Sequence, residues 1–288
     1  MTQSDAFDPV EFKKKIRAEW RSAAAGWRKW YDVLEAEESG QLISGKLIQL
    51  AGIGPGASVL DVGGGYGEPS LTAARAVGPE GRVVCTDISG EMLAFGRERA
   101  TEAGLDNVEF LECDAEQLDF EDESFDAVVS RATLMFLPDV AGTLGHLHSF
   151  LKPSGRFAAS VWGPQSTVQF SAAIPVIFAD LQLPPPPPGR PGPFALADRD
   201  RLAVLVAGAG FRNVETGTVC AVFATETPEQ FTEFIRDVAP PITNLVKAQQ
   251  PDVQERIWGK VTEAWRKFLD ADGRVRTEND AIWVAGTK

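Results

Sequence analysis

The stretch that most restricts the fold of this chain runs from Val59 to Pro69, with the sequence VLDVGGGYGEP. The apolar run Ser58 to Val62 predicts a parallel strand that is buried on both faces, and glycines then interrupt it. Gly63, Gly65 and Gly67 lack a Cβ atom, so the backbone can adopt positive φ and a ligand can approach it closely. We therefore expect a strand, a ligand-binding turn and then a helix.

A second apolar strand, Val83 to Thr86, ends in Asp87. A carboxylate at the carboxyl end of a strand, roughly 20 residues past the glycines, is placed to accept hydrogen bonds from the two hydroxyls of a ribose. The dinucleotide pattern G-x-G-x-x-G fails, however, because Glu68 occupies the third glycine position, where a pyrophosphate would lie. The two strands predict a nucleoside-binding unit, and an NAD-dependent oxidoreductase stays open as an alternative.

The glycine spacing is D-x-G-x-G-x-G, beginning at Asp61. This pattern resembles motif I of the class I S-adenosylmethionine (SAM) methyltransferases. SAM contains an amino acid, a sulfonium and an adenosine but no phosphate, so it tolerates a carboxylate beside the loop. The resemblance implies SAM as the cofactor, with the loop glycines admitting its methionine part.

Other candidate cofactor residues follow the later strands. Ile88 and Met92 are placed to flank an adenine, although packing on the sheet would also explain them. Asp114, after the strand Val108 to Leu111, can accept from the adenine amine while the backbone N–H of Ala115 meets a ring nitrogen; the alternative is a turn residue. The strand Phe125 to Ser130 should bring polar groups to the same edge, because ligands of open α/β sheets bind at the carboxyl ends of the strands. The predicted cofactor site comprises Asp61, Gly63, Gly65, Gly67, Asp87, Ile88, Met92, Asp114, Ala115, Ser130 and Arg131.

The segments SRATLMFLPD, from Ser130, and LKPSGRF, from Leu151, extend the resemblance. From Gly52 to Trp162 the chain is similar to the methyltransferase type 11 group, which includes the ubiquinone and menaquinone biosynthesis C-methyltransferases. This similarity implies an α/β, Rossmann-like sheet of seven strands with an antiparallel last strand, and methyl transfer to a small molecule. Gly64 departs from the family pattern, in which another residue often precedes the second glycine.

The predicted organisation is a single structural domain in four segments. Residues 1–57 form a helical cap, and residues 58–162 form the SAM-binding core. Residues 163–197 form a proline-rich lid or connector, and residues 198–288 supply the rest of the sheet with an inserted helical pair. The tract Pro184 to Pro193 cannot be a helix or a central strand. It is interpreted as part of a lid, with partner binding as the alternative.

Aromatic residues of the cap predict an acceptor pocket. Trp27, Trp30 and Tyr31 recur at helical spacing, and they either pack on the core or roof the site together with Trp162. Such walls suit an apolar or planar acceptor, with carbon or oxygen as the methylated atom. Glu68 and Tyr31, or Asp32 beside it, are the candidate bases. The pair His146 and His148 lies on different faces of one predicted helix, so no metal site is predicted.

The net charge of −13 argues against nucleic-acid partners, which need clustered Lys and Arg. No apolar run is long enough to span a membrane, and a cytoplasmic protein is the simplest expectation. The two helices inserted before the last strand complete the acceptor chamber or form a homodimer contact. A third hypothesis is a non-catalytic SAM-binding scaffold that captures a partner through the tract Pro184 to Pro193.

Overall fold

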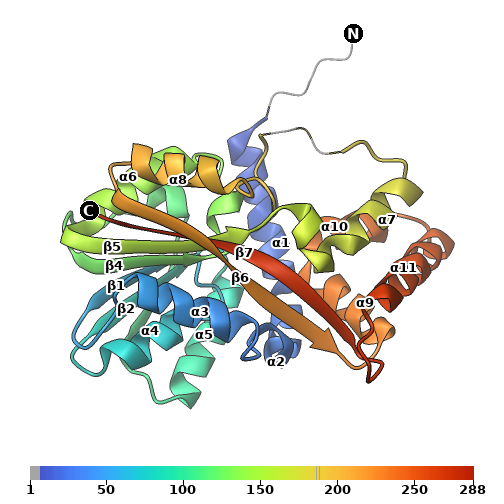
Figure 1. The fold of residues 1–288 in the computed structure, drawn as a ribbon, viewed down its shortest axis with the longest axis horizontal. Helices are drawn as coiled ribbons and strands as arrows, with labels where there is room; N and C mark the ends of the chain where they lie inside the picture. The colour runs from blue at the N-terminus through green and yellow to red at the C-terminus, as the bar shows by residue number, and fades with distance from the viewer. Residues whose placement is uncertain (1–6, 186, 188) are drawn as a thin grey trace, which may run out of the picture.

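The computed structural model describes residues 7–185, 187 and 189–288. A seven-stranded sheet runs through the molecule in the order β3-β2-β1-β4-β5-β7-β6 (Figure 1). All neighbouring strands from β3 to β5 are parallel, whereas β7 is antiparallel to both β5 and β6. The strands are β1 Ser58–Val62, β2 Arg82–Asp87, β3 Val108–Glu112, β4 Phe125–Arg131, β5 Leu151–Trp162, β6 Arg212–Thr225 and β7 Val275–Thr287. The predicted α/β, Rossmann-like class I sheet, with its antiparallel last strand, is confirmed.

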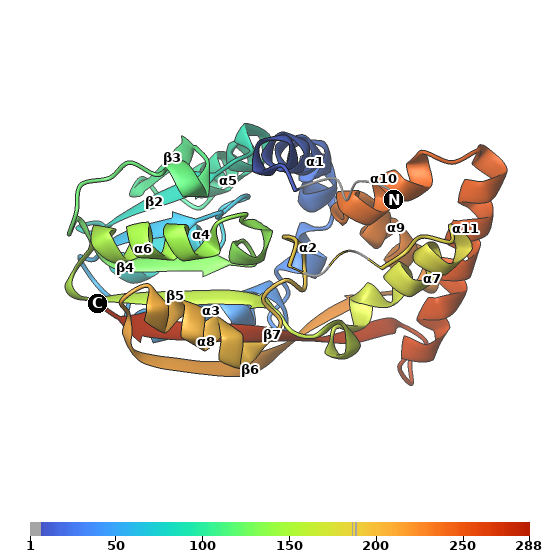
Figure 2. The same ribbon diagram turned by 90° about the horizontal axis from the view of Figure 1, so that it is seen from above.

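Helices cover both faces of the sheet. The helices α3, α4 and α5 lie on one face and α6 and α8 on the other, while α7, α9, α10 and α11 gather beyond one end of β6 and β7 (Figure 1). Figure 2 shows α1 lying between α5 and these added helices. The helices are α1 Pro9–Lys29, α2 Tyr31–Leu34, α3 Gly40–Leu50, α4 Ser70–Val77, α5 Gly90–Glu102, α6 Val140–Phe150, α7 Ala173–Asp180, α8 Arg199–Gly208, α9 Pro228–Val238, α10 Pro240–Lys247 and α11 Pro251–Trp265. Helix α1 therefore bridges the nucleoside-binding half and the appended helices.

The buried apolar side chains form three clusters. One lies between the sheet and the helices α6 and α8, the second between the sheet and α3 and α4, and the third fills the group of added helices. Trp162, at the end of β5, packs against all three clusters. The end of β5 is therefore the point where the sheet and the appended helices meet.

Side-chain caps fix the starts of several helices, as their sequences predict. Asp8 accepts from the backbone N–H groups of Val10 and Glu11 at the start of α1. Asp139 and Asp198 cap α6 and α8 in the same way. These caps fix the starts of α1, α6 and α8 at Pro9, Val140 and Arg199.

Some boundaries differ from the expectation. The sequence suggests a break or a close contact at Gly26: the first helix is interrupted at Trp30, between α1 and α2, and Gly26 makes a close contact with α9. Strand β5 begins at Leu151, so the segment LKPSGRF already belongs to the strand, and β7 starts at Val275. Leu151 pairs with Phe125 of β4, and long antiparallel pairing with β6 extends β7; local sequence cannot reveal either contact.

The proline-rich tract is described except at positions 186 and 188, which lie outside the described residues. Its described residues contain neither helix nor strand, and the N–H of Gly192 donates to the carbonyl of Met135 at 2.9 Å. The tract therefore returns to the sheet edge beside Leu134–Phe136. No helix in the described part of the chain is both long and apolar enough to cross a membrane.

Candidate cofactor and acceptor site

The glycine loop after β1 has the open backbone that the sequence predicts. Gly63, Gly65 and Gly67 all have positive φ, of 75°, 51° and 100°. A Cβ atom at Gly63 would lie 2.1 Å from Oγ1 of Thr133, so only glycine fits there. The loop N–H groups are used within the protein, however: those of Gly63 and Gly64 donate to the Thr86 carbonyl at 2.8 and 2.9 Å. The N–H groups of Gly63 and Gly64 are therefore already paired within the protein.

Asp61 supports the loop from below. Its side chain is fully buried, and Oδ2 accepts a hydrogen bond from the Ser70 hydroxyl at 2.6 Å. Burial raises the pKa of Asp61 to about 7, against the opposing effect of Ser70. A Cβ atom at Gly64 would lie 2.4 Å from this carboxylate and 2.6 Å from the Cys85 thiol. The unusual Gly64 is thus explained by the close packing of the loop on Asp61 and Cys85.

Asp87 stands at the carboxyl end of β2, beside the loop. Oδ2 accepts from the N–H of Gly65 at 3.1 Å, and Oδ1 accepts from the N–H of Ser89 at 2.8 Å. Burial raises the pKa of Asp87 to about 6, although these backbone donors act in the opposite direction. Each carboxylate oxygen retains a lone pair that can accept another hydrogen bond. The two hydroxyls of a ribose could donate these bonds.

One cavity, of about 160 Å³, brings most of the predicted residues together. It extends from the ends of β2 and β3 past the glycine loop to Trp162 and Phe223 on the far side. Cofactor candidates in its wall are Gly63, Gly65, Asp87, Ile88, Met92, Asp114, Ala115 and Arg131, and Glu68, Trp27 and Trp162 line it as well. The predicted cofactor edge and part of the predicted acceptor pocket are thus continuous.

Six predicted site residues do not line this cavity: Asp61, Gly67, Ser130, Trp30, Tyr31 and Asp32. Asp61 is buried under the loop, where it accepts from Ser70. Gly67 belongs to the loop but packs against Leu71 and Gly96. Ser130 is buried and donates to the Val62 carbonyl at 2.8 Å. Trp30 donates from Nε1 to Asp237 at 2.9 Å, which fixes α1 to α9.

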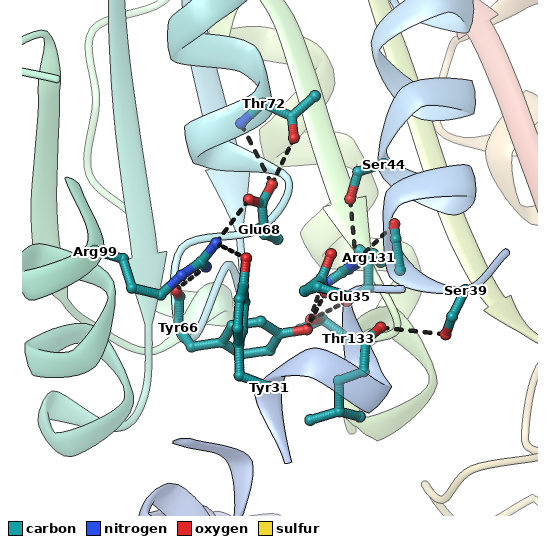
Figure 3. A network of polar contacts seen from close by, with 12 residues as sticks. Tyr31, Glu35, Ser39, Ser44, Tyr66, Glu68, Thr72, Arg99, Arg131 and Thr133 are labelled. Carbon is teal, nitrogen blue, oxygen red and sulfur yellow. Dashed lines mark hydrogen bonds and ion pairs between the residues drawn. The ribbon is translucent and has the colours of Figure 1, made fainter. Parts of the chain in front are cut away.

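Tyr31 and Glu68, the candidate bases, belong to one ion-pair cluster with Arg99 (Figure 3). Nη2 of Arg99 lies 3.1 Å from Oε1 of Glu68 and donates to the Tyr31 hydroxyl at 2.5 Å. The hydroxyl of Thr72 also donates to Glu68, at 2.7 Å. Burial raises the pKa of Tyr31 above its ordinary value, although Arg99 opposes this. Both groups are therefore occupied by protein partners, which weakens either as a base.

A second cluster, which the sequence did not reveal, links Glu35, Tyr66 and Arg131 (Figure 3). The Tyr66 hydroxyl donates to Oε1 of Glu35. Nη2 of Arg131 donates to both, at 2.5 Å each. All three side chains are at least nine-tenths buried. Burial raises the pKa of Tyr66 well above its ordinary value, so Tyr66 stays a neutral phenol.

Sequence reasoning also missed cavity residues of α1 and of the segment after β4. Lys13, Ile16 and Trp20 line the cavity from α1, and Thr133 and Phe136 line it from the other side. The spacing of Ile16, Trp20 and Trp27 on one face of a helix was the available signal. The described residues contain no group of three His, Cys, Asp or Glu side chains that could hold a metal ion.

Comparison with known proteins identifies a domain that includes the glycine loop, Asp87 and Asp114. A family described as "Methyltransferase domain" matches residues 53–173. The ubiquinone/menaquinone biosynthesis C-methyltransferase UbiE of Brucella suis (strain ATCC 23445 / NCTC 10510) is 44% identical over 104 residues, which is 36% of this chain. The corresponding protein of Brucella canis is 43% identical over the same length. Each match spans only 39% of the relative's own length.

Solved structures share the fold over nearly the whole chain. Phosphoethanolamine N-methyltransferase 2 of Haemonchus contortus, in complex with SAM, has a TM-score of 0.58 at 16% identity and covers 98% of this chain, with 60% of its own chain matched. Geranyl diphosphate C-methyltransferase of Streptomyces coelicolor A3(2) has a TM-score of 0.56 at 15% identity, over 96% of this chain and 98% of its own. The [4+2]-cyclase SpnF has a TM-score of 0.52 at 20% identity, over 85% of this chain and 80% of its own. Residues 53–173 thus match a methyltransferase domain, and the chain as a whole shares the fold of these solved structures.

Proposed function

We propose that the protein transfers a methyl group from SAM to a small acceptor that is apolar at its reacting end, with carbon or oxygen as the methylated atom. The observation that carries this proposal is the cavity itself. One part is bordered by the glycine loop and Asp87, and the other is walled by aromatic side chains.

The residues along the cofactor part of the cavity suit the methionine, ribose and adenine parts of SAM in turn. Gly63 and Gly65 leave room for the methionine part, and the Asp87 carboxylate suits the ribose hydroxyls. Ile88 and Met92 would flank the adenine, and Asp114 with the N–H of Ala115 would bind its edge. These assignments remain predictions, supported by the presence of all seven residues in one cavity wall.

The acceptor part favours an apolar molecule. Trp20, Trp27, Phe136, Trp162 and Phe223 line the cavity. The guanidinium of Arg131 also reaches it, but this group already has partners. Nη1 donates to the Gly40 carbonyl at 2.9 Å and the Ser44 hydroxyl at 3.0 Å, and Nη2 donates to Glu35 and Tyr66. A charged acceptor that bound Arg131 would have to break these buried bonds, at a large penalty.

Methyl transfer requires little acid–base help from the protein. The nucleophile displaces the sulfonium in line, so alignment of the two reactants and exclusion of water supply much of the rate acceleration. A base is needed only where the nucleophile must lose a proton. Methylation at carbon also releases a proton, which leaves the methylated carbon after the transfer. Since Tyr31 and Glu68 are both held by Arg99, an already ionised phenolate is the favoured nucleophile: attack through oxygen releases no proton, and after attack through carbon the ring proton can pass to the phenolate oxygen. The names of the Brucella and Streptomyces relatives, which are C-methyltransferases, support carbon and an acceptor of quinol or isoprenoid type.

Transfer of a labelled methyl group from SAM tests this proposal. We expect label in phenolic, quinol or isoprenoid acceptors and none in phosphoethanolamine. Trp162→Ala should raise KM for the acceptor and leave the affinity for S-adenosylhomocysteine (SAH) unchanged. Labelling of phosphoethanolamine alone would overturn the assignment of an apolar acceptor.

The remaining expectations about partners also stay predictions. We expect no nucleic-acid partner, which the net charge of −13 supports, together with a cytoplasmic location and a capacity to form homodimers. A scaffold role would require partner capture by the tract Pro184 to Pro193. The fold also occurs in the cyclase SpnF, so turnover must be measured and not assumed from the fold.

A further inference from the structure

Helix α1 lies across the adenine end of the cavity and is joined to the nucleoside-binding half by ion pairs. Figure 2 shows α1 alongside α5. Arg17 pairs with Glu112 at 3.9 Å, and Arg21 pairs with Glu91 at 2.7 Å. All four of these side chains are more than two-fifths exposed, so each pair contributes little by itself.

Lys13 differs from these residues because its pairs are shielded from solvent. Its Nζ lies 2.8 Å from Oδ2 of Asp114 and 2.5 Å from Oε2 of Glu116. The exposed fractions of the three side chains are 20%, 11% and 15%. Burial alone would lower the pKa of Lys13, but the hydrogen bonds to the two carboxylates outweigh it and raise that pKa. Lys13 is thus held as a cation in the cavity wall.

The two carboxylates are fixed on their other sides as well. Oδ1 of Asp114 accepts from the N–H of Glu116 at 2.9 Å, and Oε1 of Glu116 accepts from the N–H of Asp139 at 2.6 Å. Lys13 therefore completes a set of contacts that sets the orientation of the Asp114 carboxylate. Neighbouring α1 residues Ile16, Trp20 and Trp27 line the same cavity.

We propose that Lys13 is a positioning residue that couples the docking of α1 over the cavity to recognition of the adenine edge by Asp114. This inference rests on the proposed SAM-binding function. Lys13 holds Oδ2 of Asp114 so that its remaining lone pairs point into the cavity, where they accept from the adenine amine. Linkage requires the reverse effect too: a bound adenosine that engages Asp114 stabilises α1 in its docked position.

Lys13→Met tests the proposal, with Lys14→Met as the matched control. Lys14 is on the same helix but is 69% exposed and pairs only locally with Glu11. Each variant is titrated with SAH and with S-inosylhomocysteine, in which a carbonyl oxygen replaces the amine that Asp114 would accept from. We expect Lys13→Met to weaken SAH binding by about 10- to 100-fold, the effect of one charge-assisted hydrogen bond, and Lys14→Met to bind as the wild type does.

The comparison of ligands separates positioning from a merely structural effect. In the wild type SAH should bind more tightly than the inosine analogue, and Lys13→Met should reduce this preference, whereas Lys13→Arg should largely restore it. Equal losses for both ligands, or unchanged SAH binding, would overturn the role of Lys13. Failure of the wild-type protein to bind SAH would instead overturn the proposed function itself.

Discussion

At the scale of single residues, we expect Asp87 to determine how cofactor binding depends on pH. Burial raises its pKa to about 6, and ribose hydroxyls donate to the ionised carboxylate. We predict that SAH affinity is constant above this pKa and falls as the pH drops through about 6. The stability of the ligand-free protein changes in the opposite direction. Because the folded-state pKa lies above that of the unfolded chain, stability decreases as pH rises through the same window.

Calorimetric titration of SAH at several pH values measures this dependence. Asp87→Asn is the control, because it removes the titrating group while keeping the shape. It should weaken binding by about 1.5–3 kcal/mol at neutral pH and abolish the part of the pH dependence that belongs to Asp87. A pH profile that is identical in both proteins would show that Asp87 does not hold the ribose.

Removing the Glu35 carboxylate should lower the free energy of unfolding far more than removing a carboxylate from an exposed ion pair. It neutralises Arg131 in a buried setting, so Glu35→Ala leaves an uncompensated charge and should destabilise the fold by about 3–5 kcal/mol. Glu98→Ala, which breaks the exposed pair with Arg28, should change stability by about 1 kcal/mol or less. Denaturant unfolding of the two variants measures the difference, and equal losses would contradict the role assigned to Glu35.

The sequence revealed some of these residues and concealed others for a physical reason. Asp87 and the loop glycines follow a fixed spacing, because one short strand–turn–helix unit holds them together. Glu35, Tyr66 and Arg131 are 31 and 65 residues apart along the chain, so no local spacing marks their contact. Tyr66 could have been noticed from its place inside the glycine loop, but its partners depend on the tertiary fold.

At the scale of secondary-structure elements, Gly26 controls how closely α1 approaches α9. A Cβ atom there would lie 2.3 Å from the backbone carbonyl oxygen of Asp237, and a backbone atom cannot move aside cheaply. Gly26→Ala should therefore separate the two helices and lower the free energy of unfolding by about 1–3 kcal/mol.

Gly259→Ala is the matched control for this substitution. Gly259 lies inside α11, and nothing is within 4 Å of a Cβ atom at that position. Alanine should there stabilise the protein by about 0.5–1 kcal/mol, through its better helix propensity. Thermal unfolding of both variants gives the sign of each effect, and stabilisation by Gly26→Ala would refute the close-contact explanation.

The bounds of helices and strands were predictable where capping residues and apolar periodicity mark them. They were not predictable where contacts between distant segments set them. The helix α9 has the bounds Pro228–Val238 that its proline start and apolar periodicity predict. The N-terminal helix, by contrast, breaks at Trp30, whose indole donates to Asp237 of α9. The length of β7 is set by its pairing with β6 along Thr225 to Arg212. Such contacts between distant segments cannot be predicted from the local sequence.

At the scale of the whole molecule, the site depends on parts that lie outside the matched methyltransferase domain. Residues 53–173 supply the glycine loop, Asp87 and Asp114, but α1 and β6 contribute Trp20, Trp27 and Phe223 to the cavity. The curated relatives match 104 residues of this chain, and we expect the segments on either side of the matched domain to determine the acceptor. The fold class was predictable because it follows from the motif, whereas the acceptor chamber comes from segments without a motif.

Parallel calorimetric titrations with SAM, SAH and NADH test the central claim most directly. The account predicts saturable binding of SAM and SAH with one site per chain, and no heat of binding for NADH because Glu68 occupies the place of a pyrophosphate. Binding of NADH without binding of SAM or SAH would contradict the interpretation of the glycine loop and every assignment that depends on it.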